Sequence, residues 1–174
     1  MSEREVRTLA PMAEAPEVGR WLSAMVDARR DTLRELRGVS DDLVDLRPPG
    51  SENSIGAALY HVALIEADWL FDDILGVPLN DSEVAALFPF EDRDAEGRLT
   101  DIRGESLPDH LRRLAAVREV LIARLRPISV DDFHAPRTRE QYDVSPAWVV
   151  HHLLQHEAEH RGEIGWLKRQ ALSG

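Results

Sequence analysis

The chain has 174 residues, 43% of them hydrophobic and 30% charged, which excludes a disordered chain and fits a domain with its own core. Its formal net charge of −11 has the wrong sign for a nucleic-acid-binding surface, so we expect no nucleic-acid partner. The absence of cysteine excludes disulfides, thiolate metal sites and a cysteine nucleophile. Any thiol used in a reaction would therefore have to be a small molecule.

Neither a membrane span nor a signal peptide is evident. No apolar run approaches the roughly 18 residues that a membrane helix needs. Residues 1–7 carry mixed charge and lack the apolar segment of a signal peptide. We therefore expect a cytoplasmic protein with no membrane partner, and a single domain over residues 1–174 in which residues 1–15 form a flexible N-terminal extension.

The first predicted helix spans residues 17–37. Its apolar residues recur every three or four positions, at Val18, Leu22, Met25, Val26, Leu33 and Leu36. Gly38 follows the pattern, and glycine commonly ends a helix.

A second helix is predicted from residue 55 to residue 75. The preceding loop, 45–54, is rich in turn residues, and its Asn53 or Ser54 can cap the helix. Gly76 marks the end.

Residues 77–105 show no sustained period, and we interpret them as a long crossover with one short helix over residues 81–87. The crossover carries an acidic stretch at residues 91–96. Loops of this length are uncommon unless they cover something functional. The segment is therefore expected to shape access to a site.

Two further helices follow. The third is predicted over residues 108–126, with Ser106 or Leu107 near its start; a second loop covers residues 127–143. Ser145 and Pro146 then open a fourth helix to about residue 170. With no convincing strand pattern, the prediction is an all-α four-helix bundle with a long crossover between its second and third helices.

The fourth helix holds the most informative motif, His156-Glu157-Ala158-Glu159-His160. Residues four apart lie on one helix face, where two imidazoles can bind one divalent metal ion. At about 100° per residue, His156 and His160 fall in the middle of the apolar stripe that includes Val149 and Leu153. Imidazoles buried there must be hydrogen-bonded or metal-bound.

The second helix offers a third ligand. His61 flanks its apolar arc, and Glu66 falls inside the arc, where an unpaired carboxylate is disfavoured. We predict His61 as the third ligand and Glu66 as a partner that receives a histidine N–H or a bound water. His110 and His134 lie outside this geometry and are expected to be solvated or structural. His152 is expected at the edge of the stripe or as a support for the ligands, with a ligand role as the alternative.

A glutamate directly after the first histidine also resembles the zincin protease pattern, in which that glutamate is the general base. Glu157 occupies the position. A zincin also needs a cleft edged by a strand and a further downstream ligand, and neither is evident. Glu163 lies one turn beyond His160 and could line the pocket or pair with Arg161.

Two blocks, residues 55–69 and 148–164, together resemble the DinB-like superfamily of four-helix metalloproteins. The second block, with His156-x-x-x-His160-Arg161-Gly162-Glu163, is the more specific. The resemblance implies that His61, His156 and His160 bind a divalent metal, usually nickel or zinc. It also implies relatives that are thiol-dependent transferases or isomerases using mycothiol, bacillithiol or glutathione, with homodimers common among them.

The resulting hypothesis is a metal-dependent S-transferase that joins a low-molecular-weight thiol to a small electrophile. Three imidazoles leave an open position, as a catalytic site requires. Glu66, Glu157 or Glu163 could carry the proton, and the sequence does not choose among them. A metal-dependent hydrolase is the close alternative, and a non-catalytic metal-binding or stress-response module is the alternative from another class.

Overall fold

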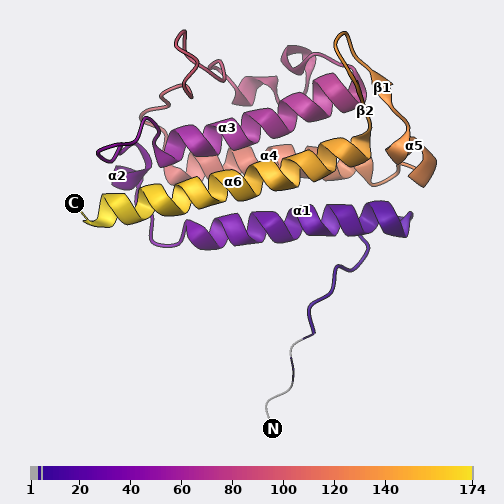
Figure 1. The fold of residues 1–174 in the computed structure, drawn as a ribbon, viewed down its shortest axis with the longest axis horizontal. Helices are drawn as coiled ribbons and strands as arrows, with labels where there is room; N and C mark the ends of the chain where they lie inside the picture. The colour runs from indigo at the N-terminus through magenta and orange to yellow at the C-terminus, as the bar shows by residue number, and fades with distance from the viewer. Residues whose placement is uncertain (1–3, 5, 174) are drawn as a thin grey trace.

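The computed structural model describes residue 4 and residues 6–173. This part of the chain is a bundle built on α1 (Pro16–Glu35), α3 (Ile55–Asp68) with its π-helical continuation η1 (Trp69–Leu75), α4 (Leu107–Leu125) and α6 (Pro146–Ser173) (Figure 1). The predicted all-α bundle is confirmed. The observed helix ends fall within a few residues of the predicted ones.

The crossover between η1 and α4 determines the topology. It contains two short 3₁₀ segments, η2 (Leu79–Asp81) and η3 (Ala85–Leu87), where a single short helix was expected. Figure 1 shows the crossover returning along the bundle, so that α3 and α4 run in the same direction. Helix α6 packs against both α1 and α3, and α3 packs against α4.

Side-chain caps begin α3, where Asn53 or Ser54 was predicted as the cap, and α4, where Ser106 or Leu107 was expected near the start. Ser54 Oγ accepts a hydrogen bond from the Ala57 N–H at 3.1 Å. Ser106 and Asp109 form a capping box at the start of α4. At the far end of η1, Gly76 takes a left-handed conformation with φ of 67°, which ends the helix with little steric cost.

Short elements precede both α3 and α6. Helix α2 (Asp41–Val44) precedes α3, while α5 (Val130–His134) and an antiparallel hairpin, β1 (Arg137–Thr138) with β2 (Asp143–Val144), precede α6. No strand was predicted, because two-residue strands are too short to show an alternating pattern.

Part of the expected N-terminal extension packs against α1. The Met12 N–H donates to the Gly19 carbonyl at 3.2 Å, and a Cβ at Gly19 would lie only 2.7 Å from the Met12 nitrogen. Residues 1–3 and 5 lie outside the described residues. Within the described chain, none of the helices is both long and apolar enough to cross a membrane.

Candidate metal centre

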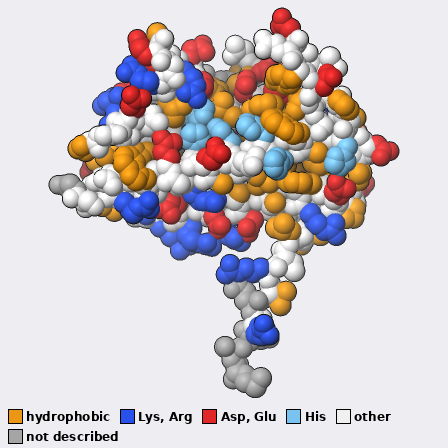
Figure 2. All heavy atoms as spheres, in the orientation of Figure 1, with side chains coloured by type: hydrophobic (Ala, Val, Ile, Leu, Met, Phe, Trp, Pro, Cys, Tyr) orange, Lys and Arg blue, Asp and Glu red, His pale blue; other side chains and the backbone are white. Residues whose placement is uncertain are grey.

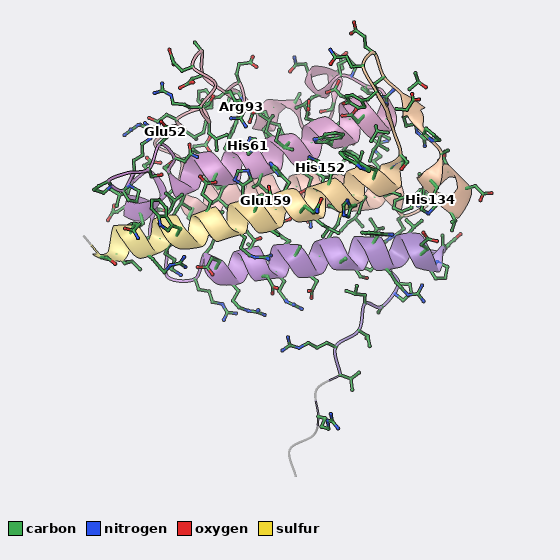
Figure 3. The ribbon with its side chains drawn as sticks, viewed as in Figure 1. Glu52, His61, Arg93, His134, His152 and Glu159 are labelled. Carbon is green, nitrogen blue, oxygen red and sulfur yellow. The ribbon has the colours of Figure 1, made fainter. Side chains whose placement is uncertain are left out.

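His61, His156 and His160 come together between α3 and α6. The ring centroids form a nearly equilateral triangle, with separations of 4.9 Å (61 to 156), 4.7 Å (61 to 160) and 4.6 Å (156 to 160). One ring nitrogen from each residue lies within 4.8 Å of the other two. Figure 3 shows His61 in the space between the two helices. The structure thus brings together the three residues named from the sequence.

Two carboxylates orient the rings. Asp92 Oδ1, from the crossover, pairs with His61 Nδ1. Glu163 Oε2 accepts from His160 Nδ1 at 2.8 Å, and its other oxygen accepts from Asn53 Nδ2 at 2.7 Å. A histidine whose Nδ1–H is held by a carboxylate presents Nε2 as a lone-pair donor, which is the usual arrangement around protein-bound metals.

Electrostatics favour a neutral imidazole at His156. Burial, together with repulsion from the neighbouring histidines, lowers the pKa of His156 to about 3. Burial opposes ionisation of Asp92, but its hydrogen bond and charge interaction with His61 lower its pKa overall. The hydrogen bond to His160 lowers the pKa of Glu163 despite partial burial. A neutral His156 and ionised carboxylates at Asp92 and Glu163 suit the binding of a divalent cation.

The donor set fits a divalent metal. His156 Nε2 and His61 Nε2 lie 3.0 Å apart. A tetrahedral ion at about 2.05 Å from each nitrogen sets ligand nitrogens roughly 3.3 Å apart, so small side-chain shifts would complete the site. The three histidines can therefore hold a metal ion and leave at least one position for another molecule.

The histidines lie at the margin of the buried face of α6, and our placement in its middle was wrong. His156 and His160 are only partly buried, whereas Glu157 is 2% exposed. The buried face is rotated toward Glu157, because arginines inside the bundle neutralise that carboxylate. As a result the site opens to the surface: Figure 2 shows histidine side chains in a band across the front face, where α3 and α6 meet.

Glu66 and Glu157 belong to a separate buried cluster, here called the ion quartet: Arg29, Glu66, Arg118 and Glu157. Arg29 bonds Glu157 at 2.7 Å and Glu66 at 2.8 Å; Arg118 bonds Glu66 at 2.6 Å and Glu157 at 2.7 Å. Thr32 Oγ1 also donates to Glu157 at 2.9 Å.

Each of α1, α3, α4 and α6 supplies one member of the quartet. Glu66 was expected to accept a hydrogen bond from a histidine N–H or a bound water, but it pairs with Arg29 and Arg118 instead. Both glutamates accept several charged hydrogen bonds, and Arg29 and Arg118 lower the pKa of Glu157 despite its burial. Carboxylates fixed in this way are poor proton carriers, so we assign Glu66 and Glu157 a role in joining the helices and assign proton transfer to neither.

An acidic cavity of about 390 Å³ adjoins the centre, lined by α3, η1 and the crossover. It shares Asp92 with the histidine site and also contains Asp68 and Asp72. Burial, then the hydrogen bond and charge of Asp72, raise the pKa of Asp68 to about 7. The cavity therefore holds a carboxyl group that exchanges protons near neutral pH.

The remaining histidines lie elsewhere. His110 is buried beside Arg113 and His134 pairs with Glu17 at the surface, in line with the structural or solvated roles expected. His152 stands next to His156, with ring centroids 6.1 Å apart. It is therefore a neighbour of the three-histidine set, as expected for an edge residue.

Asp92 is the main site residue that sequence reasoning missed. It lies within the acidic stretch 91–96, and nothing distinguishes it there from its neighbours. The available signal was the length of the crossover, which was expected to cover a functional site. Only the folded path of the crossover shows which carboxylate contacts His61.

Comparison with protein families supports this picture. The family model of the DinB superfamily matches residues 24–164, which include all three histidines, Asp92 and Glu163. No curated protein is similar enough in sequence to count as a match. The family match covers most of the chain, and the protein belongs to the DinB superfamily.

Proposed function

We propose that this protein is a metal-dependent thiol S-transferase, in which His61, His156 and His160 hold a divalent metal, nickel or zinc. The observation that carries the proposal is the triangle of imidazoles, two of them backed by carboxylates, at a partly exposed site. Such a set leaves a position open to a substrate, whereas structural zinc sites close all four positions with protein ligands. Membership of the DinB superfamily supports the metal, and the thiol chemistry is what the sequence resemblance to that family implies.

A divalent metal held there supplies Lewis acidity and favours the thiolate form of a thiol. The thiolate sulfur forms a bond to the electrophilic carbon, and the leaving group departs with the bonding electrons. The thiol proton passes to solvent or to Asp68, which exchanges protons near pH 7. Glu163 and Asp92 hold His160 and His61 in their ligand orientation. We assign Glu163 this positioning role in place of a proton shuttle.

The experiment is a screen of mycothiol, bacillithiol and glutathione with 1-chloro-2,4-dinitrobenzene as electrophile, using protein loaded with Zn²⁺ or Ni²⁺ and protein stripped with a chelator. Thiol-dependent turnover by the loaded protein alone, lost in His156→Ala, is the expected result. His151→Ala is the matched control, because His151 is exposed on the same helix.

Two alternatives give different results in the same screen. A hydrolase cleaves p-nitrophenyl esters without any thiol. A non-catalytic metal-binding or stress-response module binds metal and turns over neither kind of substrate. Loaded protein that is inactive with every thiol therefore rejects the transferase assignment while leaving the metal site standing. A small-molecule substrate, cytoplasmic location and homodimer remain predictions.

A further inference from the structure

A second hollow lies beyond the histidines, where η1, the β1–β2 hairpin and the start of α6 meet. Its volume is about 450 Å³, within the usual range for small-ligand sites. Three aromatic side chains, Trp69, Tyr142 and Trp148, dominate its lining. Tyr142 and Trp148 remain 48% and 49% exposed. Large aromatic side chains left half-exposed around a concave surface are typical of a binding site.

Local backbone features build this hollow. Trp69 is the first residue of the π-helical segment η1, and π-helical turns occur frequently at functional sites. The Tyr142 hydroxyl donates to Asp73 Oδ1 at 2.7 Å, and Arg139 donates to the Asp73 carbonyl, which fixes the hairpin against η1. The wall formed by Tyr142 is therefore held in place before any ligand arrives.

A row of side-chain rings on one face of α6 links the hollow to the metal centre. Trp148, His152, His156 and His160 follow one another at intervals of four residues. Their successive ring centroids lie 5.1, 6.1 and 4.6 Å apart. Trp69 lies 4.9 Å from His152 and 5.5 Å from Trp148, so α3 and η1 supply the opposite side. Eight residues at 1.5 Å each separate Trp148 from His156 by about 12 Å along the helix.

We propose that this hollow binds an uncharged, planar aromatic group of the substrate, whose reacting end reaches the three histidines about 12 Å away. The proposal rests on the proposed function, because it concerns the substrate of the same site. Trp69 and Trp148 pack against each other with ring centroids 5.5 Å apart, and the aromatic surface that they and Tyr142 turn toward the hollow favours a flat π-system over an aliphatic chain. Asp143 in the lining and the net charge of −11 disfavour an anion, and His134, the other ionisable lining residue, is already paired with Glu17.

The first experiment measures the binding of 2-naphthylmethanol by calorimetry, with its saturated analogue decahydro-2-naphthylmethanol as the aliphatic comparison. The naphthyl compound is expected to bind at least several-fold more tightly. Trp148→Ala, or Trp148→Leu should the alanine variant fold poorly, should weaken its binding about tenfold. Trp166→Ala is the control, because Trp166 is another partly exposed tryptophan of α6 outside this hollow.

The naphthyl compound should bind equally to chelator-stripped protein and to His156→Ala, which separates this proposal from the proposed function. A parent protein that binds the naphthyl compound but takes up neither Zn²⁺ nor Ni²⁺ sinks the proposed function alone. Equal binding of the aliphatic analogue, or no effect at Trp148, overturns the aromatic site. A dimer that Trp148→Ala dissociates in sedimentation would also overturn it, by showing that a second copy covers the hollow.

A second experiment tests the connection to the histidines. Naphthyl groups carrying a thiol on alkyl spacers of increasing length are titrated into Zn²⁺-loaded and stripped protein. Above a threshold length, the loaded protein should bind the thiol compound at least tenfold more tightly than the stripped protein, because the second contact becomes intramolecular. The absence of any length dependence contradicts a shared substrate path.

Discussion

Replacing Arg118 with methionine should destabilise the bundle strongly. Arg118 is 6% exposed and donates to both glutamates of the ion quartet and to the Met25 carbonyl. Without it, Glu66 and Glu157 share a single cation, Arg29. Leaving a buried charge without its partner costs about 3–5 kcal/mol. Methionine keeps much of the apolar volume, so little of this loss comes from a cavity.

The measurement is urea unfolding of metal-free protein, followed by circular dichroism at pH 7. Arg124→Met is the matched control, since Arg124 lies on the same helix and pairs with Glu83 at the surface. An exposed ion pair contributes about 0–1 kcal/mol, so this control should unfold nearly like the parent. Equal losses in the two variants would refute the role of the quartet.

The pH dependence provides an independent check. The quartet holds the pKa of Glu157 below its unfolded value, so its stabilisation is present above about pH 4.5 and is lost as the pH falls through the folded pKa. Arg118→Met removes one of the two arginines that lower the pKa of Glu157, so this pKa is higher in the variant than in the parent. The variant's deficit should therefore shrink toward pH 4. A deficit that grows on acidification would contradict the assignment.

Three further predictions concern the site. Asp92→Asn should weaken metal binding about 10- to 100-fold with little change in the urea midpoint, and undiminished affinity in calorimetry would count against its support of His61. Burial raises the pKa of Asp68, so ionised Asp68 destabilises the folded protein above the pKa that this group has in the unfolded chain. Asp68→Asn should therefore raise the free energy of unfolding by about 1–2 kcal/mol at pH 8, after allowance for solvent exposure. The gain should be smaller at pH 4. A gain independent of pH in urea titrations would disprove this. A Cβ at Gly162 meets no atom within 4 Å, so Gly162→Ala should raise the unfolding free energy by about 0.5–1 kcal/mol; a loss would show that a neighbour approaches the helix there.

The sequence predicted the long helices and the ligand set because both follow from local spacing. The regular recurrence of apolar residues and capping residues such as Ser54 indicate where the helices lie. The four-residue interval between His156 and His160 places both side chains on one helix face. His61 was predicted as the third ligand because it flanks the apolar arc of its own helix. These inferences need only one helix at a time, together with the assumption that two of the helices face each other.

What the sequence did not predict depends on contacts between distant segments. The apolar pattern that predicted α1 includes Val26 and Leu33, but both are about 40% exposed, while Arg29 and Thr32 are buried. The same ion quartet turned Glu157 inward on α6. A buried charge is inferred only when its partners are known, and those partners lie on other helices.

The crossover shows the same limit. Asp92, 31 positions after His61, pairs with it because the crossover folds back over α3. The hairpin that completes the aromatic hollow is too short to leave a pattern in the sequence.

Calorimetric titration of metal-free protein with Zn²⁺ and Ni²⁺ tests the central claim most directly. We predict one ion per chain, an affinity at least 100-fold weaker in each of His61→Ala, His156→Ala and His160→Ala, and no change in His151→Ala. Binding that survives all three substitutions, or a parent protein that takes up neither ion, would contradict a three-histidine metal centre.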